Sequence, residues 1–222
     1  YQSDTSHRAA VVAKNEADLH TKLSKLADMI DTKPDAPFTS PDGSAYGLGP
    51  STGGVGFVFP GQGSQYLRMG ADLAMGFDAA RAPWDRAADL ALGDAPRIDQ
   101  VVFPNSRFSD SDRAADEDTL RATEWAQPAI GVTSLSLLSM MQDLGITAQA
   151  VAGHSFGEIT ALHAGGVLSE MDMLRVARKR GELMAAAAEL EGAMSAVSTD
   201  LDQVETMLSD LGRDDVVIAN HN

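Results

Sequence analysis

A turn between two regular elements, Gly153-His154-Ser155-Phe156-Gly157, restricts the possible folds of this chain most strongly. It follows a run of small apolar residues at 148–152, which is typical of a strand, and leads into helical spacing through Ile159, Leu162 and Ala164. Glycines two positions either side of a serine are needed where a strand and a helix approach closely, and such a turn presents the serine as a nucleophile. The alternative is an ordinary glycine-rich turn between a strand and a helix.

Strand and helix patterns alternate along the chain, which predicts an α/β fold with a mostly parallel sheet flanked by helices. Residues 1–54 are interpreted as a linker segment, residues 55–191 as the large α/β core, and residues 192–222 as the start of a small second unit. In the linker segment we expect a strand at 9–13, a helix from the N-cap Asn15 to Ile30 and a wrapping loop at 31–54, because proline and glycine are dense there. In the large core we expect a strand at 55–59, helical spacing from Leu67 to Ala74, and an acidic loop with a short helix at 93–123. A buried helix should follow from Gln127 to Gly145, with Pro128 in its first turn, and a helix capped at Ser169 should run to about 191. In the C-terminal unit we expect strands at 193–198 and 216–219 and, between them, a helix through Val204, Leu208 and Leu211.

The charge and composition exclude several classes of protein. The 222 residues include 17 lysines and arginines against 32 aspartates and glutamates, a net charge of −15, so the long-range field repels nucleic acids and anionic membranes. An anionic ligand therefore has to bind at a local cluster of positive charge. With no cysteine there is no disulfide, thiolate metal site or cysteine nucleophile, and no apolar run reaches 18 residues. The chain begins with Tyr1 and stops directly after an apolar run, so we expect both ends to be cut from a longer polypeptide.

Two further groups of residues can bind an anion. The glycine-rich loop at 61–65 lacks the pattern of a nucleotide-binding loop, but its backbone N–H groups can supply one of the two donors that an oxyanion hole needs. Arg175, Arg178, Lys179 and Arg180 lie within six positions. These four side chains form either a solvated helix face or a site for an acidic substrate, since arginine can bind a carboxylate through two parallel hydrogen bonds.

The five histidines do not include a convincing general base for Ser155. His154 is adjacent to the serine, and neighbouring side chains at such a turn point in different directions. His163 lies two turns along the following helix, while His7, His20 and His221 fall in end or linker segments. The absence of a convincing histidine base is itself informative about the chain.

Four motifs occur in order along the chain: FVFPGQGSQ at 57–65, EWAQPA at 124–129, GHSFGE at 153–158 and RKRG at 178–181. Together they resemble the malonyl-CoA:acyl carrier protein transacylase family, and more narrowly the acyltransferase domain of a type I polyketide or polyunsaturated fatty acid synthase. The segment from Ala9 to Ile30 resembles the linker between the ketosynthase and acyltransferase domains of such synthases.

This resemblance implies a role for each matching residue. Ser155 would be the acylated nucleophile, the backbone N–H groups of Gln62 and Phe156 the oxyanion hole, Arg180 the partner of the malonyl carboxylate, and Gln127 a residue that lines and orders the site. The fold would be the acyltransferase or patatin-like hydrolase core with the start of an inserted ferredoxin-like subdomain. The catalytic histidine and the C-terminal half of the domain would lie beyond Asn222.

The implied reaction transfers a malonyl-type unit from acyl-CoA to the phosphopantetheine thiol of an acyl carrier protein, in the cytoplasm, with no bound cofactor or metal and with malonyl-CoA as substrate. A neighbouring ketosynthase domain would share the polypeptide. Phe156 followed by GEIT at 157–160 resembles iterative synthases, and the extender unit stays open between malonyl and related groups. Two alternatives remain: a serine hydrolase of the patatin-like or α/β-hydrolase type, and an inactive fragment that needs the missing C-terminal part.

Overall fold

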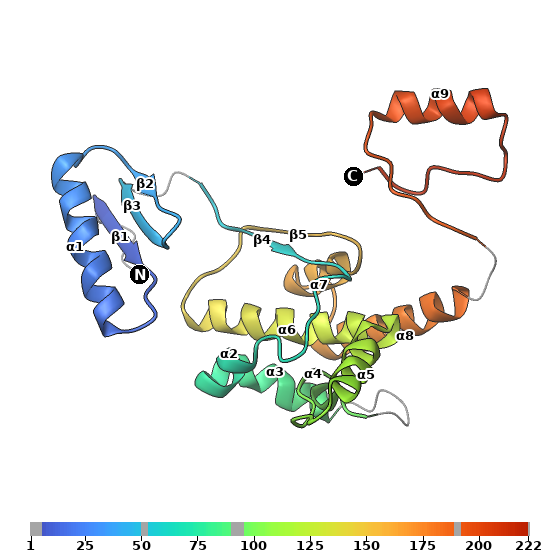
Figure 1. Ribbon diagram of the computed structural model, residues 1–222, viewed down its shortest axis with the longest axis horizontal. Helices are drawn as coiled ribbons and strands as arrows, with labels where there is room; N and C mark the ends of the chain where they lie inside the picture. The colour runs from blue at the N-terminus through green and yellow to red at the C-terminus, as the bar shows by residue number, and fades with distance from the viewer. Residues whose placement is uncertain (1–5, 50–52, 90–95, 189–191, 222) are drawn as a thin grey trace.

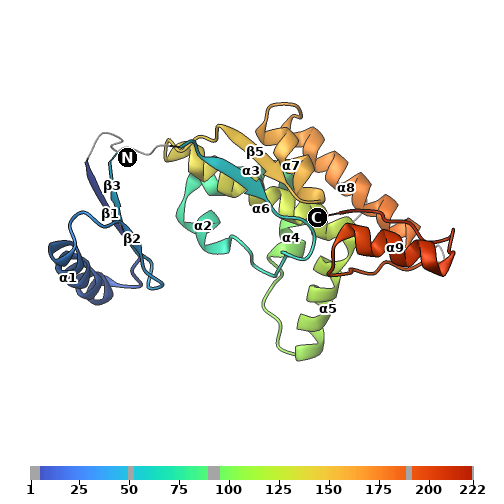
Figure 2. The ribbon, with the colours of Figure 1, turned by 90° about the horizontal axis from the view of Figure 1, so that it is seen from above.

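A computed structural model describes residues 6–49, 53–89, 96–188 and 192–221 of the chain. A small N-terminal module lies at one end of a larger, mainly helical body, and the last helix lies beyond the C-terminal end of α8 (Glu170–Ala187; Figures 1 and 2). No helix within these ranges is both long and apolar enough to cross a membrane.

The N-terminal module is a three-stranded antiparallel sheet with one helix. Its elements are β1 (His7–Val11), α1 (Glu16–Thr32), β2 (Phe38–Thr39) and β3 (Ser44–Leu48), and the strand order is β1-β3-β2. The predicted helix is confirmed, since the Asn15 side chain accepts from the N–H of Asp18 at 2.9 Å. The predicted strand is found two residues earlier than expected.

The prediction of a loop throughout 31–54 is wrong, because β2 and β3 lie within it. The prolines and glycines stand mostly at the ends of these short strands, where they form turns. Pro37 precedes β2, and the turn at Pro41-Asp42-Gly43 places Gly43 at φ 85°. The high density of turn residues therefore marks a tight hairpin here. This hairpin was not predicted because β2, a strand of two residues, is too short to show a periodic pattern.

The larger body contains two parallel strands, β4 (Gly56–Phe59) and β5 (Ala150–Gly153), with Phe57 opposite Val151 and Phe59 opposite Gly153. The helix α7 (Phe156–Ala164) follows β5 directly. Phe59 is buried on the side of the helices, whereas Val58 on the opposite face is 77% exposed. A parallel strand pair packed against helices confirms the α/β fold class.

The long helix α6 (Thr123–Asp143) runs through the middle of the helical body (Figure 1) and buries residues on nearly every side. Its neighbours are α3 (Asp78–Ala88), α4 (Ile98–Val102), α5 (Asp110–Arg121), α7 and α8 (Glu170–Ala187), while α2 (Ala71–Gly76) packs on α3. The side chains that fill the core between them include Trp84, Val102, Leu120, Ile130, Leu135, Phe156 and Leu174.

The expected acidic loop at 93–123 holds two helices, α4 and α5, over its described residues. Ser109 begins α5, since its side chain accepts from the N–H of Asp112, and Leu120 buries its side chain in the core. The full helical pattern of α5 was not predicted because Leu120 is its single buried residue and many charged residues surround it in the sequence.

The helix α6 begins at Thr123 and not at Gln127, so Pro128 lies inside it. A proline in this position removes the N–H that would bond to the carbonyl of Glu124. The guanidinium of Arg178 on α8 donates to that carbonyl instead, at 2.9 Å. The contact from Arg178 on α8 thus allows Pro128 to lie inside the helix, one turn after the position that the sequence predicts.

The C-terminal residues contain the predicted helix, α9 (Leu201–Leu211), but the strands predicted at 193–198 and 216–219 are wrong. These two segments are extended and exposed, with Met194 at 92% and Val217 at 78%. A strand needs a neighbour to accept its ladder of hydrogen bonds. Neither segment has such a neighbour among the described residues.

Arg68 adopts a left-handed backbone conformation, with φ 64°, and its N–H donates to the carbonyl of Val102 at 2.8 Å. This conformation is unfavourable for a residue with a Cβ atom by roughly 1 kcal/mol or more. We expect Arg68→Gly to raise the free energy of unfolding by about 0.5 to 1 kcal/mol, after the greater chain entropy of glycine is taken into account. Arg68→Ala is the matched control, since it removes the same side chain but keeps the Cβ atom. Urea unfolding compares the two variants. Equal stabilities would contradict the claim that the backbone at Arg68 is strained.

The helix α8 begins at Ser169, whose hydroxyl accepts from the N–H of Asp172 at 3.1 Å and contacts the Asp172 carboxylate at 2.7 Å. The predicted cap is therefore confirmed. The Ser169 hydroxyl first, and then the Arg175 guanidinium, lower the pKa of Asp172 below its ordinary value of 3.8.

Ser169→Ala should lower the free energy of unfolding near pH 7 by about 1 kcal/mol, the usual effect of losing a capping hydroxyl. A carboxyl group whose pKa is lowered by folding stabilises the fold above its unfolded pKa, and this contribution is lost as the pH falls through the folded pKa. The difference between the unmodified chain and Ser169→Ala should therefore shrink between about pH 5 and the acid limit. Chemical unfolding at a series of pH values measures it, and a difference that does not change with pH would refute the charge contribution.

Candidate functional site

Ser155 stands at a strained turn between β5 and α7. Its backbone has φ 54° and ψ −115°, which is unusual for a residue with a side chain, and it is the residue before the first turn of α7. Gly153 and Gly157 permit this turn, because a Cβ atom on Gly153 would lie 2.1 Å from the carbonyl carbon of Gly157. The strand-turn-helix geometry that the sequence predicts around the serine is present.

The Gln62 loop (residues 61–65) follows β4 and lies beside this turn. Since β4 and β5 are parallel, their C-terminal ends meet at the same edge. A Cβ atom on Gly61 would lie 2.7 Å from the carbonyl oxygen of His154 and 3.3 Å from the Cβ of Ser155. The backbone of the Gln62 loop therefore passes directly against the serine, as only a glycine at position 61 allows.

Two backbone N–H groups beside Ser155 have no acceptor in the described part of the chain: those of Gln62 and Phe156. The next two N–H groups of α7 are used, since Gly157 donates to the carbonyl of His154 at 2.9 Å and Glu158 to that of Ser155 at 3.1 Å. The N-terminus of α7 also places the positive end of the helix dipole at the serine. The Phe156 ring points away into the core, where it is fully buried.

Arg180 reaches the same place from α8. Its Nη2 lies 3.5 Å from the Oγ of Ser155, and its Nη1 donates to the Oε1 of Gln127 at 2.8 Å. The other three basic residues of this cluster pair with carboxylates on their own helix: Arg175 with Asp172, and Arg178 and Lys179 with Glu182. Arg175 and Lys179 are solvated, whereas Arg178 packs against α6 and donates to the Glu124 carbonyl. Within the described ranges Arg180 has no carboxylate partner, so the cluster presents one guanidinium without a counter-charge at the serine.

Gln127 fixes the position of Arg180 from α6. Its side chain is fully buried, and while Oε1 accepts from Arg180, Nε2 contacts the Sδ of Met184 at 3.3 Å. Both ends of the amide are thereby occupied. The first turn of α6 also meets α8 closely, because a Cβ atom on Gly181 would lie 2.5 Å from the carbonyl oxygen of Thr123. Arg180 is therefore placed by a tight contact between two helices.

No histidine forms a hydrogen bond with the Ser155 hydroxyl in the part of the chain that is described. His7 bonds to the hydroxyl of Tyr46 at 2.6 Å, and His163 to the carbonyl of Leu168 at 2.9 Å. His154 is exposed, and its backbone N–H donates to the carbonyl of Phe59. Across the described residues no three histidine, aspartate or glutamate side chains are grouped so that they can hold a metal ion.

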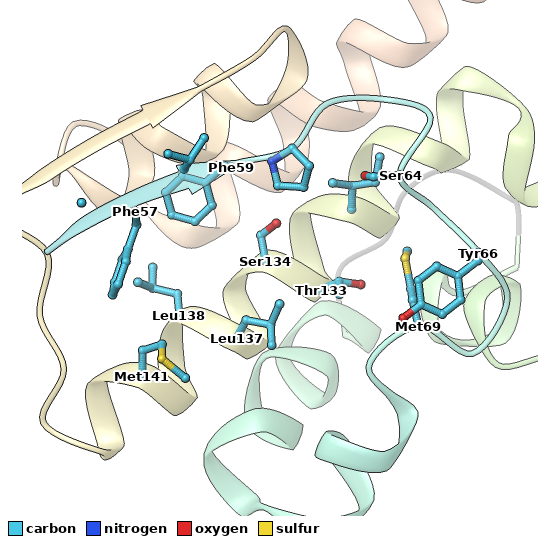
Figure 3. Close-up of a pocket in the computed structure, with 14 residues that line it drawn as sticks. Phe57, Phe59, Ser64, Tyr66, Met69, Thr133, Ser134, Leu137, Leu138 and Met141 are labelled. Carbon is cyan, nitrogen blue, oxygen red and sulfur yellow. The ribbon is translucent and has the colours of Figure 1, made fainter. Parts of the chain in front are cut away.

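A cavity of about 380 Å³ lies on the other side of the Gln62 loop, between β4 and α6. Figure 3 shows Phe57 and Phe59 of the strand facing Ser134, Leu138 and other side chains of the helix across it. Ser155 and Arg180 do not line this cavity. Its walls are mainly apolar, and the strained serine and the arginine lie at the turn and not in this cavity.

Comparison with known proteins agrees with this geometry. A family profile described as acyl transferase domain matches residues 56–222. The chain belongs to the acyl transferase domain family. The malonyl CoA-acyl carrier protein transacylase of Bacillus subtilis (strain 168) is 38% identical over 144 residues, which are 64% of this chain and 41% of that protein. The polyketide synthase type I Pks15/1 for phenolphthiocerol synthesis of Mycobacterium bovis is 35% identical over 211 residues, which are 92% of this chain and 9% of that protein.

Among solved structures, the acyltransferase domain from the second module of the salinomycin polyketide synthase superposes with a TM-score of 0.71 at 30% identity. The superposition covers 94% of this chain and 44% of that domain. This acyl transferase chain therefore spans less than half the length of each of these relatives.

The structure brings together all five residues that the sequence singled out, namely Ser155, Gln62, Phe156, Arg180 and Gln127. Two contacts of this candidate site were not predicted from the sequence. Met184 contacts Gln127, and Thr123 accepts a hydrogen bond from the Gln62 side chain at 3.2 Å. Thr123 was missed because the helix was expected to begin at Gln127. Helical spacing was the available signal, since Thr123 lies four positions before Gln127.

Gly157 tests how tightly the turn is packed. A Cβ atom there would lie 2.0 Å from the carbonyl oxygen of Phe59, so Gly157→Ala should lower the free energy of unfolding by about 1 to 3 kcal/mol or more, because β4 and α7 must move apart. Gly76→Ala is the control, since its Cβ would meet nothing within 4 Å, and it should be neutral or stabilise by up to about 1 kcal/mol. Thermal and urea unfolding of the two variants compare them directly, and equal stabilities would show that the close approach is absent.

Proposed function

We propose that this chain is part of an acyltransferase that moves a malonyl group from malonyl-CoA to the phosphopantetheine thiol of an acyl carrier protein, in polyketide or fatty acid synthesis. One observation carries the proposal: Arg180, which has no carboxylate partner among the described residues, lies 3.5 Å from the hydroxyl of the strained serine. A dicarboxylic acyl group on Ser155 would bring its free carboxylate to that guanidinium. The names of the relatives point to the same substrate.

The reaction takes place in two exchanges at Ser155. Its Oγ attacks the thioester carbonyl, the hydroxyl proton passes to a general base, and the backbone N–H groups of Gln62 and Phe156 donate to the oxyanion of the tetrahedral intermediate. The C–S bond then breaks, CoA leaves as the thiol after it takes up a proton, and a malonyl ester remains on the serine. The pantetheine thiol attacks this ester, and the C–O bond to Ser155 breaks to regenerate the hydroxyl. Exchange between a thioester and an ester needs no metal or redox cofactor.

Arg180 selects the acyl group in this proposal. A malonyl carboxylate that leaves water near the serine is unfavourable unless a cation pairs with it, and the planar guanidinium can donate two parallel hydrogen bonds. Gln127 holds that guanidinium through its Oε1 at 2.8 Å. An acetyl group has no such partner and would gain nothing from Arg180.

The general base is proposed to come from polypeptide outside these 222 residues, because the chain spans 41% of the Bacillus subtilis enzyme and no described histidine bonds to Ser155. The same polypeptide would cover the exposed face of β4 around Val58 and the cavity beside it. Parallel strands are normally covered on both faces, which supports this proposal. The N-terminal module is proposed to connect to a ketosynthase domain, and an acyl-CoA substrate favours a cytoplasmic location.

Transfer of radiolabelled malonyl from malonyl-CoA to holo acyl carrier protein by the intact acyltransferase tests the proposal. Labelled carrier protein with the unmodified enzyme, and none with Ser155→Ala, is the expected result. Release of free malonate with no transfer would instead indicate a hydrolase and would contradict the proposal.

Arg180→Ala should lower kcat/KM for malonyl-CoA about 100-fold, because removing one partner of a desolvated charge pair costs about 3 kcal/mol. Its kcat/KM for acetyl-CoA should change only a few-fold, since that acyl group has no carboxylate. Arg175→Ala is the control on the same helix, because Arg175 is exposed and paired with Asp172. Equal losses for the two acyl-CoA substrates in a steady-state transfer assay would show that Arg180 does not bind the carboxylate.

A further inference from the structure

The first turn of α6 holds two parts of the site through residues four positions apart. Thr123 accepts from the Nε2 of Gln62 at 3.2 Å, and Gln127 accepts from the Nη1 of Arg180 at 2.8 Å. Residues at i and i+4 lie on the same face of a helix. A single helix face thus contacts both the Gln62 loop and the guanidinium beside Ser155.

Thr123 also contacts α8 through its backbone. Its carbonyl oxygen lies where a Cβ atom on Gly181 would be only 2.5 Å away, and Gly181 follows Arg180 directly. The neighbouring carbonyl of Glu124 accepts from Arg178, whose guanidinium also lies 4.1 Å from the centre of the Trp125 ring. The backbone at Thr123 is therefore fixed by α8, so its hydroxyl is held in place where it accepts from the Gln62 side chain.

The Gln62 loop has few other restraints near its reactive N–H. The residue is exposed and stands between Gly61 and Gly63, of which Gly63 has φ 107°. Bonds within the loop join Ser64 Oγ to the Gly61 carbonyl and the Gly63 N–H to the Gln65 side chain, and neither of them reaches the helical body. Among the hydrogen bonds of the described residues, the one from Gln62 to Thr123 ties the loop to the helical body.

We propose that Thr123 is a positioning residue for the oxyanion hole: its hydroxyl holds the Gln62 side chain so that the Gln62 backbone N–H stays beside Ser155. This inference rests on the proposed function, in which that N–H stabilises the oxyanion. Thr123 does not touch the acyl group or the reacting atoms. Removing an oxyanion-hole donor altogether lowers kcat about 100- to 1000-fold, so a donor that is only loosened should cost less, about 10-fold.

The effect of Thr123 on the Gln62 loop can be measured without an activity assay, by hydrogen–deuterium exchange of the 222-residue chain. Thr123→Val keeps the shape of the side chain but removes the acceptor, so the amides of 61–65 should exchange several-fold faster. Thr123→Ser keeps a hydroxyl and should exchange like the unmodified chain. Thr133→Val is the matched control, because the Thr133 hydroxyl on the same helix bonds only to the Ala129 carbonyl among the described residues. Unchanged exchange in Thr123→Val would overturn the proposal.

Kinetics of the intact acyltransferase supply the second arm. Thr123→Val should lower kcat for malonyl transfer about 10-fold, with KM and the preference for malonyl-CoA over acetyl-CoA retained, because Arg180 is undisturbed. Gln62→Leu should reproduce this loss, and the double variant should lose no more than either single variant. Additive losses, or an equal loss in Thr133→Val, would overturn the positioning role. If the unmodified enzyme transfers no malonyl group, the proposed function fails, whereas the exchange experiment still decides whether Thr123 holds the loop.

Discussion

The close approach of Gly157 to the carbonyl of Phe59 is the constraint on which the rest of the site depends. A Cβ atom at Gly157 would lie 2.0 Å from that oxygen, so β4, β5 and α7 meet here without any intervening side chain. The chain can then turn from β5 into α7 at once, which places Ser155 in its strained conformation before the helix N-terminus. The same contact brings the end of β4, and with it the Gln62 loop, against the serine. The positions of the nucleophile and of two free N–H groups thus follow from one steric condition.

A second constraint operates between α6 and α8. The proline at 128 leaves the Glu124 carbonyl without its helical partner, and Arg178 replaces it. Gly181 allows the two backbones to touch at Thr123. These contacts set the register of α8 so that Arg180 faces the serine, while Arg175 and Lys179 face their own acidic neighbours. In a chain with a net charge of −15, a guanidinium that has no carboxylate partner in the described ranges is the feature that favours an acidic acyl group.

The sequence predicted the α/β class, the turn at Ser155 and the caps of α1 and α8, because each depends on residues close together in the chain. The predictions from the sequence were wrong where the local structure depends on a residue far along the chain. The start of α6 depends on Arg178 from another helix, and the strands expected at 193–198 and 216–219 have no partner among the described residues. The hairpin of β2 and β3 was hidden because β2, with two residues, is too short for a periodic pattern. The site residues were found from their motifs, but the contacts of Thr123 and Met184 needed the packing of α6 against its neighbours.

In the proposed reaction the acyl group on Ser155 presents a carboxylate to Arg180. A crystal structure of the intact acyltransferase after reaction with malonyl-CoA tests this contact most directly. We expect a malonyl ester on the Oγ of Ser155, with its carbonyl oxygen within hydrogen-bond distance of the N–H groups of Gln62 and Phe156 and its carboxylate paired with the Arg180 guanidinium. An ester whose carboxylate points to solvent or to another cation, with Arg180 still bound only to Gln127, would contradict it.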